Sequence, residues 1–255
     1  MMFRAVVFLA GPSSRLAGEK ATSWTHWQPQ TEPLTASAAV RVYIADAGLQ
    51  AFLNWYETLT PDQQACLESI AWCGDGDSLG KHGKEIRAHT AARFEGRWKE
   101  HLYSETKDFS DCAAITSLLE YDLRHAGDAG TRSAWIEVHG ALGGRLDHEI
   151  VNLLEFSESL ARMGCLAAYA LGPDALLTTL GVKADLPQGE RFSVTSLRVP
   201  SQAKVEIKGA QYSGSVFLRQ ASHGLSNVVQ QPPLSVTPLN ANEPVLLFRV
   251  SSADE

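Results

Sequence analysis

Long apolar runs and clusters of basic residues are both scarce in this 255-residue chain. No stretch approaches the roughly 20 apolar residues that span a membrane. The apolar run at residues 5–10 is shorter than a secretory signal needs, and Pro12 follows it at once, so a first buried strand is expected there. The net charge of −7 argues against nucleic-acid or membrane binding, which needs clustered Lys and Arg. We therefore expect a soluble, cytoplasmic protein that binds neither.

Paired cysteines and the familiar phosphate-binding motifs are also missing. The four cysteines are scattered, with no Cys-x-x-Cys pair, which favours buried thiols in a reducing compartment over a zinc site or disulfides. The stretches GPSSRLAGEK (11–20) and GDSLGKHGK (76–84) lack the spacing of a P-loop, and no Gly-x-Gly-x-x-Gly opens a helix after the first strand. A phosphorylated ligand of this acidic chain would need metal ions or local cations to offset repulsion.

What the chain does contain is a series of short apolar runs that end in Gly- or Asp-bearing turns. Continuous apolar runs are typical of parallel strands buried on both faces. Stretches with a 3.6-residue apolar period, at 49–59 and 110–127, lie between them and predict helices, and 149–164 is also helix-like. The runs are RAVVFLAG (4–11), VRVYIADAG (40–48), SIAWCGDGDS (69–78), AWIEVHGALGG (134–144) and CLAAYALGP (165–173).

The pattern changes near residue 185, where short segments rich in β-branched residues follow one another between turns, as in an antiparallel sandwich. We predict an α/β fold: a Rossmann-like, mostly parallel sheet domain (1–175) followed by a C-terminal antiparallel β-sandwich domain (186–255). Residues 181–190 are expected to be the linker, and the polar residues 11–37 a loop. The segments are RFSVTSLRV (191–199), AKVEIKG (203–209), SGSVFLRQ (213–220) and PVLLFRV (244–250).

Six carboxylates fall at the predicted strand ends or just before a helix, where parallel sheets bind ligands. Alone, Asp46 or Asp111 is explained by helix capping, the GDGDS turn by ordinary polarity, and His148 by a surface position or by pairing with Asp147. Together they would repel one another unless a divalent cation is bound, and an all-oxygen site suits Mg²⁺ shared with substrate phosphates. The six are Asp46, Asp75, Asp77, Asp108, Asp111 and Asp147, with Gly143, Gly144 and Arg145 beside the last.

In the same order along the chain, these motifs resemble those of the thiamine pyrophosphokinase family. ADAG (45–48) is similar to the family's Ala-Asp-Gly-Gly, GDGDS (74–78) to Gly-Asp-Phe-Asp-Ser and KDFSD (107–111) to Lys-Asp-x-Thr-Asp. GALGGRLDHEIVNL (140–153) is nearly unaltered, and GAQYSGSVFLRQASHGLSN (209–227) resembles a segment of the family's second domain. The first 40 residues and 79–103 match poorly. Ala47 and Gly76 replace a glycine and a phenylalanine of the family.

The resemblance implies a homodimer that transfers pyrophosphate from ATP to the hydroxyl of thiamine, with Mg²⁺ as cofactor. It implies that the catalytic residues are Asp75, Asp77, Asp111, Arg145 and Asp147, the first three of them around the metal. Nucleotide or thiamine would be bordered by Asp46, Ser78, Asp108, Gly143, Gly144, Ser222, Ser226 and Asn227. Glycines before a helix let phosphate approach its positive end, and Arg145 offers a planar cation that matches phosphate oxygens.

Two other functions stay open at this point. One is a pyrophosphokinase for a different alcohol, such as a hydroxymethylpterin, which the N-terminal motifs do not exclude. The other is a non-catalytic protein that binds thiamine or nucleotide. The element SHGLSN (222–227) favours thiamine as the acceptor, and the retention of every acidic motif residue favours catalysis.

Overall fold

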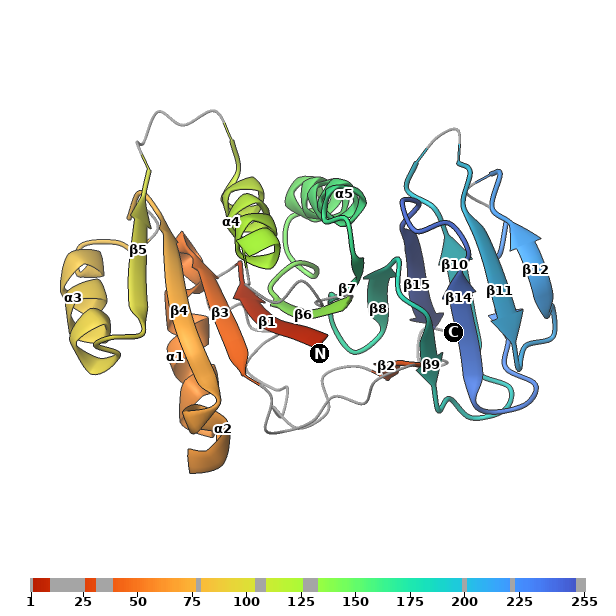
Figure 1. Ribbon diagram of the computed structural model, residues 1–255, viewed down its shortest axis with the longest axis horizontal. Helices are drawn as coiled ribbons and strands as arrows, with labels where there is room; N and C mark the ends of the chain where they lie inside the picture. The colour runs from red at the N-terminus through yellow and green to blue at the C-terminus, as the bar shows by residue number, and fades with distance from the viewer. Residues whose placement is uncertain are drawn as a thin grey trace.

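Two β-sheets, with helices on both faces of one half of the larger sheet, make up the molecule (Figure 1). The computed structural model describes residues 2–9, 26–30, 39–76, 79–103, 109–125, 133–198, 201–220 and 223–250. The larger sheet has ten strands, in the order β13-β10-β15-β8-β7-β6-β1-β3-β4-β5. Its parallel strands are β1 (Met2–Phe8), β3 (Val40–Ala45), β4 (Leu67–Gly74), β5 (Trp98–Leu102), β6 (Ser133–His139) and β7 (Leu166–Ala170).

Side chains of the parallel strands are buried alternately on the two faces of the sheet. On β1, Ala5 and Val7 belong to the core under α4 and α5, whereas Val6 and Phe8 belong to the core under α1. These strands are continuous apolar runs in the sequence because helices cover both faces of the sheet. The predicted strands of the first 170 residues are confirmed.

The helices lie on opposite faces of this parallel half (Figure 1). On one face are α1 (Leu49–Thr58) and α3 (Gly83–Arg93); on the other are α4 (Asp111–His125) and α5 (Leu146–Arg162). The short elements η2 (Asp46–Gly48) and α2 (Pro61–Ala65) flank α1. Three of the four long helices were predicted from the sequence, two of them from their apolar period. The fourth, α3, buries only Gly83 and Thr90, so it has no apolar period to detect.

Four antiparallel strands extend the larger sheet, and a second sheet packs on that extension as a β-sandwich. The extension comprises β8 (Ala175–Thr178), β15 (Val245–Val250), β10 (Arg191–Thr195) and β13 (Asn227–Val228). The second sheet has the order β12-β11-β14-β9-β2, with β2 (Trp27–Pro29), β9 (Val182–Ala184), β11 (Lys204–Lys208), β12 (Gly214–Phe217) and β14 (Leu234–Pro238). Their shared core includes Leu176, Val194, Val205 and Val236. The predicted fold class, a mostly parallel sheet followed by an antiparallel sandwich, is confirmed.

Two sequence predictions about irregular segments are wrong in part. The expected linker 181–190 contains β9, which pairs with β14 on one side and β2 on the other and buries Val182 and Ala184. Strand β2 lies within the expected loop 11–37 and buries Trp27 completely. Each strand is only three residues long, so neither leaves a period in the sequence.

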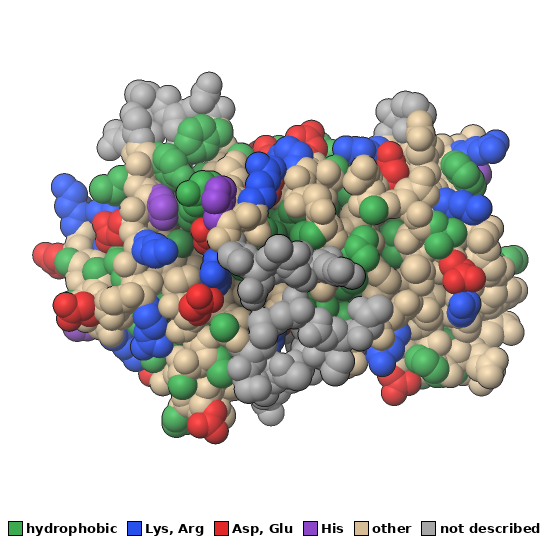
Figure 2. All heavy atoms as spheres, in the orientation of Figure 1, with side chains coloured by type: hydrophobic (Ala, Val, Ile, Leu, Met, Phe, Trp, Pro, Cys, Tyr) green, Lys and Arg blue, Asp and Glu red, His purple; other side chains and the backbone are tan. Residues whose placement is uncertain are grey.

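The face of the molecule drawn in Figure 2 carries charges of both signs. On the face in Figure 2, acidic and basic side chains lie among one another, without a large field of one sign. No helix in the described part of the chain is long and apolar enough to cross a membrane. All four cysteines lie in that part too, and none of them forms a disulfide.

Candidate functional site

The ends of β3, β4 and β6 meet at one edge of the parallel sheet. Phe8, the last residue of β1, pairs with Ile44 on β3 and with His139 on β6, and Ala45 pairs with Cys73 on β4. The chain passes from β1 to β3 on one side and later to β6 on the other, so the strand order reverses at β1. A crevice at such a reversal is the usual ligand site of an open parallel sheet.

The turns after β3 and β4 are packed tightly against each other. Asp46 is 1% exposed, and its Oδ2 accepts a hydrogen bond of 3.1 Å from the backbone N–H of Gly76. A Cβ atom at Gly74 would lie 2.7 Å from the Cβ of Asp46, and one at Gly48 would collide with the backbone oxygen of Phe8. The glycines of both motifs are therefore required by close approach of the backbone. Asp75, which follows Gly74, lies at this edge.

The two departures from the family pattern differ in their backbone. Gly76 has φ +87°, a left-handed conformation that favours glycine. Among the described non-glycine residues only Ser226 has a positive φ, so Ala47 requires no special conformation. Replacing a glycine by Ala47 therefore leaves this turn unstrained, whereas Gly76 suits the turn it occupies.

Sequence reasoning missed a cation beside the second turn. Arg87 of α3 places its guanidinium carbon 4.4 Å from the centre of the Trp72 ring. Its Nε and Nη1 atoms are buried, and they have no hydrogen-bond acceptor among the described residues. The helix that carries Arg87 has no apolar period, and its segment matches the family poorly, so no sequence signal marked this residue.

The turn after β6 is different, because its charged groups lie at the surface. Gly140 and Gly143 have positive φ values of 78° and 92°, and Arg145 is the N-cap residue of α5. Arg145 donates two hydrogen bonds to the carboxylate of Asp147, at 3.1 and 2.6 Å. These bonds lower the pKa of Asp147 below its ordinary value. His148 contributes to that lowering through its backbone and charge, so a role for its imidazole in fixing Asp147 stays a prediction.

Asp111 is the first residue of α4. Ser110 caps this helix through its Oγ, which accepts a hydrogen bond of 3.0 Å from the backbone N–H of Ala113. Capping therefore does not explain Asp111. Asp77, Ser78 and Asp108 fall outside the described residues, and within those residues no three metal-ligating side chains come together.

The last residue of β6 is a buried histidine, His139. The ring of His139 stacks on Phe8, with centroids 4.5 Å apart and planes 12° apart. Burial lowers the pKa of His139 to about 3, so the imidazole is neutral at physiological pH. It therefore contributes an uncharged, buried ring to the packing at the end of β6.

Two of the three predicted residues of the second domain, Ser226 and Asn227, lie at β13. Asn227 is 2% exposed, and its amide exchanges hydrogen bonds of 3.1 Å with both the N–H and the C=O of Tyr212. This amide therefore holds the preceding loop in place. Ser226, with φ +54°, donates its N–H to Ser193 Oγ at 3.1 Å. Ser222 lies outside the described residues.

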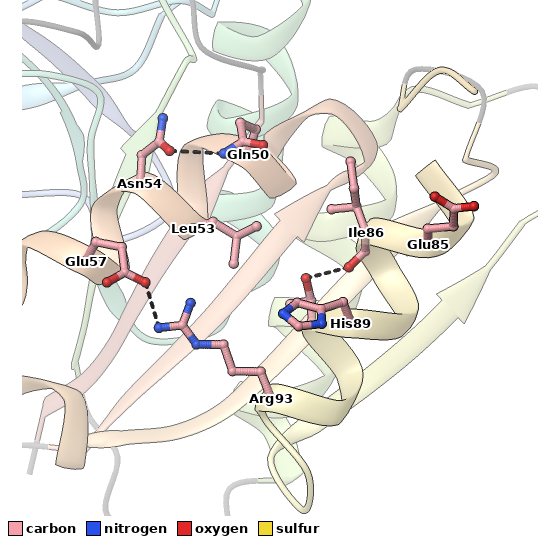
Figure 3. Close-up of a pocket in the computed structure, with 9 residues that line it drawn as sticks. Gln50, Leu53, Asn54, Glu57, Glu85, Ile86, His89 and Arg93 are labelled. Atoms are coloured by element: carbon pink, nitrogen blue, oxygen red, sulfur yellow. Dashed lines mark hydrogen bonds and ion pairs between the residues drawn. The ribbon is translucent and has the colours of Figure 1, made fainter. Parts of the chain in front are cut away.

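A separate pocket of about 490 Å³ lies between α1 and α3. Figure 3 shows Arg93 of α3 reaching across to Glu57 of α1, with Nη2 2.6 Å from Oε1. Leu53 and Ile86 are its apolar lining residues. None of the predicted site residues lines it, so it is distinct from the carboxylate edge.

Comparison with known proteins identifies the fold. Neither a family model nor a curated protein sequence matches this chain. Among solved structures, thiamine pyrophosphokinase from Bacillus subtilis superposes with a TM-score of 0.59 at 13% identity, covering 98% of this chain and 100% of that one. The Candida albicans enzyme gives 0.58 at 11% identity, covering 97% and 90%. A thiamin pyrophosphokinase family protein from Enterococcus faecalis gives 0.55 at 16%, covering 98% and 100%. The resemblance read from the motifs is thus confirmed at the level of the fold.

Proposed function

We propose that this protein is a thiamine pyrophosphokinase, which converts thiamine and ATP to thiamine diphosphate and AMP. The observation that carries the proposal is that the motif carboxylates follow parallel strands whose ends meet at one edge, in a fold shared over nearly the whole chain with thiamine pyrophosphokinases. The ordered motifs and the fold support the same family.

In the proposed reaction, the hydroxyl oxygen of thiamine attacks the β-phosphorus of ATP. The bond from that phosphorus to the oxygen bridging it to the α-phosphorus breaks, and AMP leaves with that oxygen. The hydroxyl proton passes to a carboxylate, either Asp111 or Asp75. Such transfers require mainly positioning and charge stabilisation from the protein. Arg145 would supply positive charge once a phosphate competes with Asp147 for its guanidinium.

The donor set fits Mg²⁺ shared with phosphates. Mg²⁺ usually binds through one or two carboxylates together with substrate phosphates and water. Carboxylates that follow neighbouring strands match this demand without a complete protein cage. Asp75, Asp77 and Asp111 would hold the ion, and when bound it would neutralise charge on the phosphate oxygens. Asp46, Ser78, Asp108, Gly143, Gly144, Ser222, Ser226 and Asn227 remain the proposed borders of the nucleotide and thiamine.

We further propose that the protein acts as a homodimer in the cytoplasm. Helix α5 begins beside Arg145 and exposes an apolar stripe with Leu146, Ile150 and Leu154 at 70%, 49% and 46% exposure. Residues four apart share one helix face, so a second copy could cover the stripe. Cysteines kept as thiols support a reducing compartment.

The decisive experiment is to incubate the protein with Mg-ATP, with and without thiamine, and to identify the nucleotide product. Thiamine-dependent AMP without ADP is the expected result. ADP would mean ordinary phosphoryl transfer and would overturn the mechanism. AMP that appears only with a hydroxymethylpterin would replace the acceptor. Tight binding of thiamine or ATP without turnover would indicate a binding protein.

A further inference from the structure

Arg87 and Trp72 form a structural unit that the proposed reaction has not yet used. The guanidinium of Arg87 lies over the Trp72 ring at 4.4 Å, and the indole is fully buried. Three of their donors, Arg87 Nε and Nη1 and Trp72 Nε1, are buried without an acceptor in the described part of the chain. Buried donors without acceptors are rare and costly in proteins, so the two guanidinium donors of Arg87 need an acceptor that the described residues do not supply.

This unit lies against the acidic turn that follows β4. A Cβ atom at Gly76 would lie 3.9 Å from Arg87 Cζ and 4.0 Å from its Nη2. A Cβ atom at Gly74 would lie 3.0 Å from Trp72 Cζ2 and 2.7 Å from the Cβ of Asp46. The unpaired donors are therefore next to the turn that carries Asp75, at the edge where the site is proposed.

Glycine at position 76 leaves room for the guanidinium of Arg87. The family motif has phenylalanine where this chain has Gly76, and a ring at that position would extend from a Cβ already in contact with the guanidinium. Because Gly76 has no side chain, the guanidinium of Arg87 can occupy the space beside the turn.

We propose that Arg87, held on Trp72, is an anion-binding residue of this site and contacts phosphate oxygens of the triphosphate. A guanidinium presents planar N–H groups that match phosphate oxygens, and stacking on an aromatic ring fixes its orientation. Arg145, in contrast, is already paired with Asp147. The inference deepens the proposed function and rests on it for the identity of the anion.

The test measures binding rather than turnover. Wild type, Arg87→Gln, Arg87→Lys and the control Arg93→Gln are titrated calorimetrically with ATP, with inorganic tripolyphosphate and with adenosine. Arg93 lies on the same helix but pairs with Glu57 on the α1 side. Arg87→Gln should weaken ATP and tripolyphosphate about 10- to 100-fold and leave adenosine unchanged. Arg87→Lys should fall between, because it keeps the charge but not the planar geometry, and Arg93→Gln should match wild type.

Several outcomes would overturn the proposal. They are wild-type affinity for both anions in Arg87→Gln, an equal loss of adenosine binding, and a wild-type protein that binds neither anion. Thermal melts check that each variant is folded; if Arg87→Gln does not fold, the same comparison is made with Arg87→Lys. Binding that depends on Arg87 without thiamine-dependent AMP would leave the anion site intact and refute only the proposed reaction.

Discussion

Two parts of the candidate site are built in opposite ways. The turns after β3 and β4 (46–48 and 74–76), the buried turns, are held by packing: Asp46 is 1% exposed, and glycines fill positions where a Cβ atom would collide. The turn after β6 (140–147), the exposed turn, has a side-chain ion pair whose members, Arg145 and Asp147, are 75% and 62% exposed.

This difference indicates a division of roles. The buried turns are fixed before any ligand arrives, so they can hold carboxylates at set positions at little further entropic cost. The exposed turn satisfies its own charges in water. In the proposed function, Arg145 would exchange Asp147 for a phosphate when one binds. Substitutions should therefore separate the two: the buried turns should affect both stability and activity, and the exposed turn activity alone.

The largest effect is expected from Asp75, the carboxylate within the second buried turn. Asp75→Asn removes a charge from the proposed Mg²⁺ and phosphate site and should lower kcat at least about 100-fold. Asp77→Asn should behave in the same way. Asp62→Asn, on the exposed helix α2, is the matched control. A Mg²⁺ titration of thiamine-dependent AMP formation measures the loss, and full activity of Asp75→Asn at ordinary Mg²⁺ would refute its assignment.

Next comes the packing of the buried turns. Asp46→Ala leaves the backbone N–H of Gly76 without its acceptor and should reduce the free energy of unfolding by about 1–3 kcal/mol. Urea denaturation measures this change. Asp46→Asn keeps an acceptor oxygen and should lose less stability. If neither Asp46→Ala nor Asp46→Asn changed the free energy of unfolding, the hydrogen bond from Gly76 to Asp46 would not hold the turn.

Acid should weaken the packing around the buried His139. Because burial lowers the pKa of His139 from 6.5 to about 3, its neutral form contributes stability that is present above pH 6.5 and lost as pH falls towards 3. The loss should reach about 1.4 kcal/mol per pH unit in that window. Unfolding measured from pH 7.5 to 4.5 should show a smaller slope for His139→Phe and an unchanged one for the exposed His89→Gln. Identical slopes in all three proteins would contradict the assignment.

The exposed turn should give the smallest change in stability. Arg145→Ala should leave the melting temperature within experimental error, because an ion pair so open to solvent contributes little. Its kcat/KM for ATP should still fall about tenfold through the lost phosphate contact. A clear drop in melting temperature would show that this turn, too, is held by its own contacts.

Sequence patterns predicted the elements whose burial is regular. Strand β1 is buried on both faces and leaves a continuous apolar run in the sequence, whereas α1 is buried on one face and leaves a 3.6-residue period. Elements without such a period were missed: α3 buries two small residues, β5 (Trp98–Leu102) is an edge strand with an irregular burial pattern, and β9 is three residues long. The positions of these elements are set by contacts with segments that are distant in the chain.

The same limit applies to the site. Asp46 and Asp75 were predicted because each follows a recognisable strand, and parallel strands end at one edge. Arg87 was not, because its relation to Trp72 and Gly76 arises only when α3 folds back over β4. The role of Asn227 was also hidden: its amide bonds the backbone of Tyr212, fifteen residues earlier.

The place of β15 in the larger sheet has a consequence for biosynthesis. This strand, Val245–Val250, lies between β8 and β10 and so connects the parallel half to the outer strands. Because the ribosome makes the chain from its N-terminus, β10 and β13 must wait for these residues before joining the sheet. A nascent chain halted before residue 245 would expose unpaired edges on both β8 and β10, and such edges are what chaperones and aggregating partners bind.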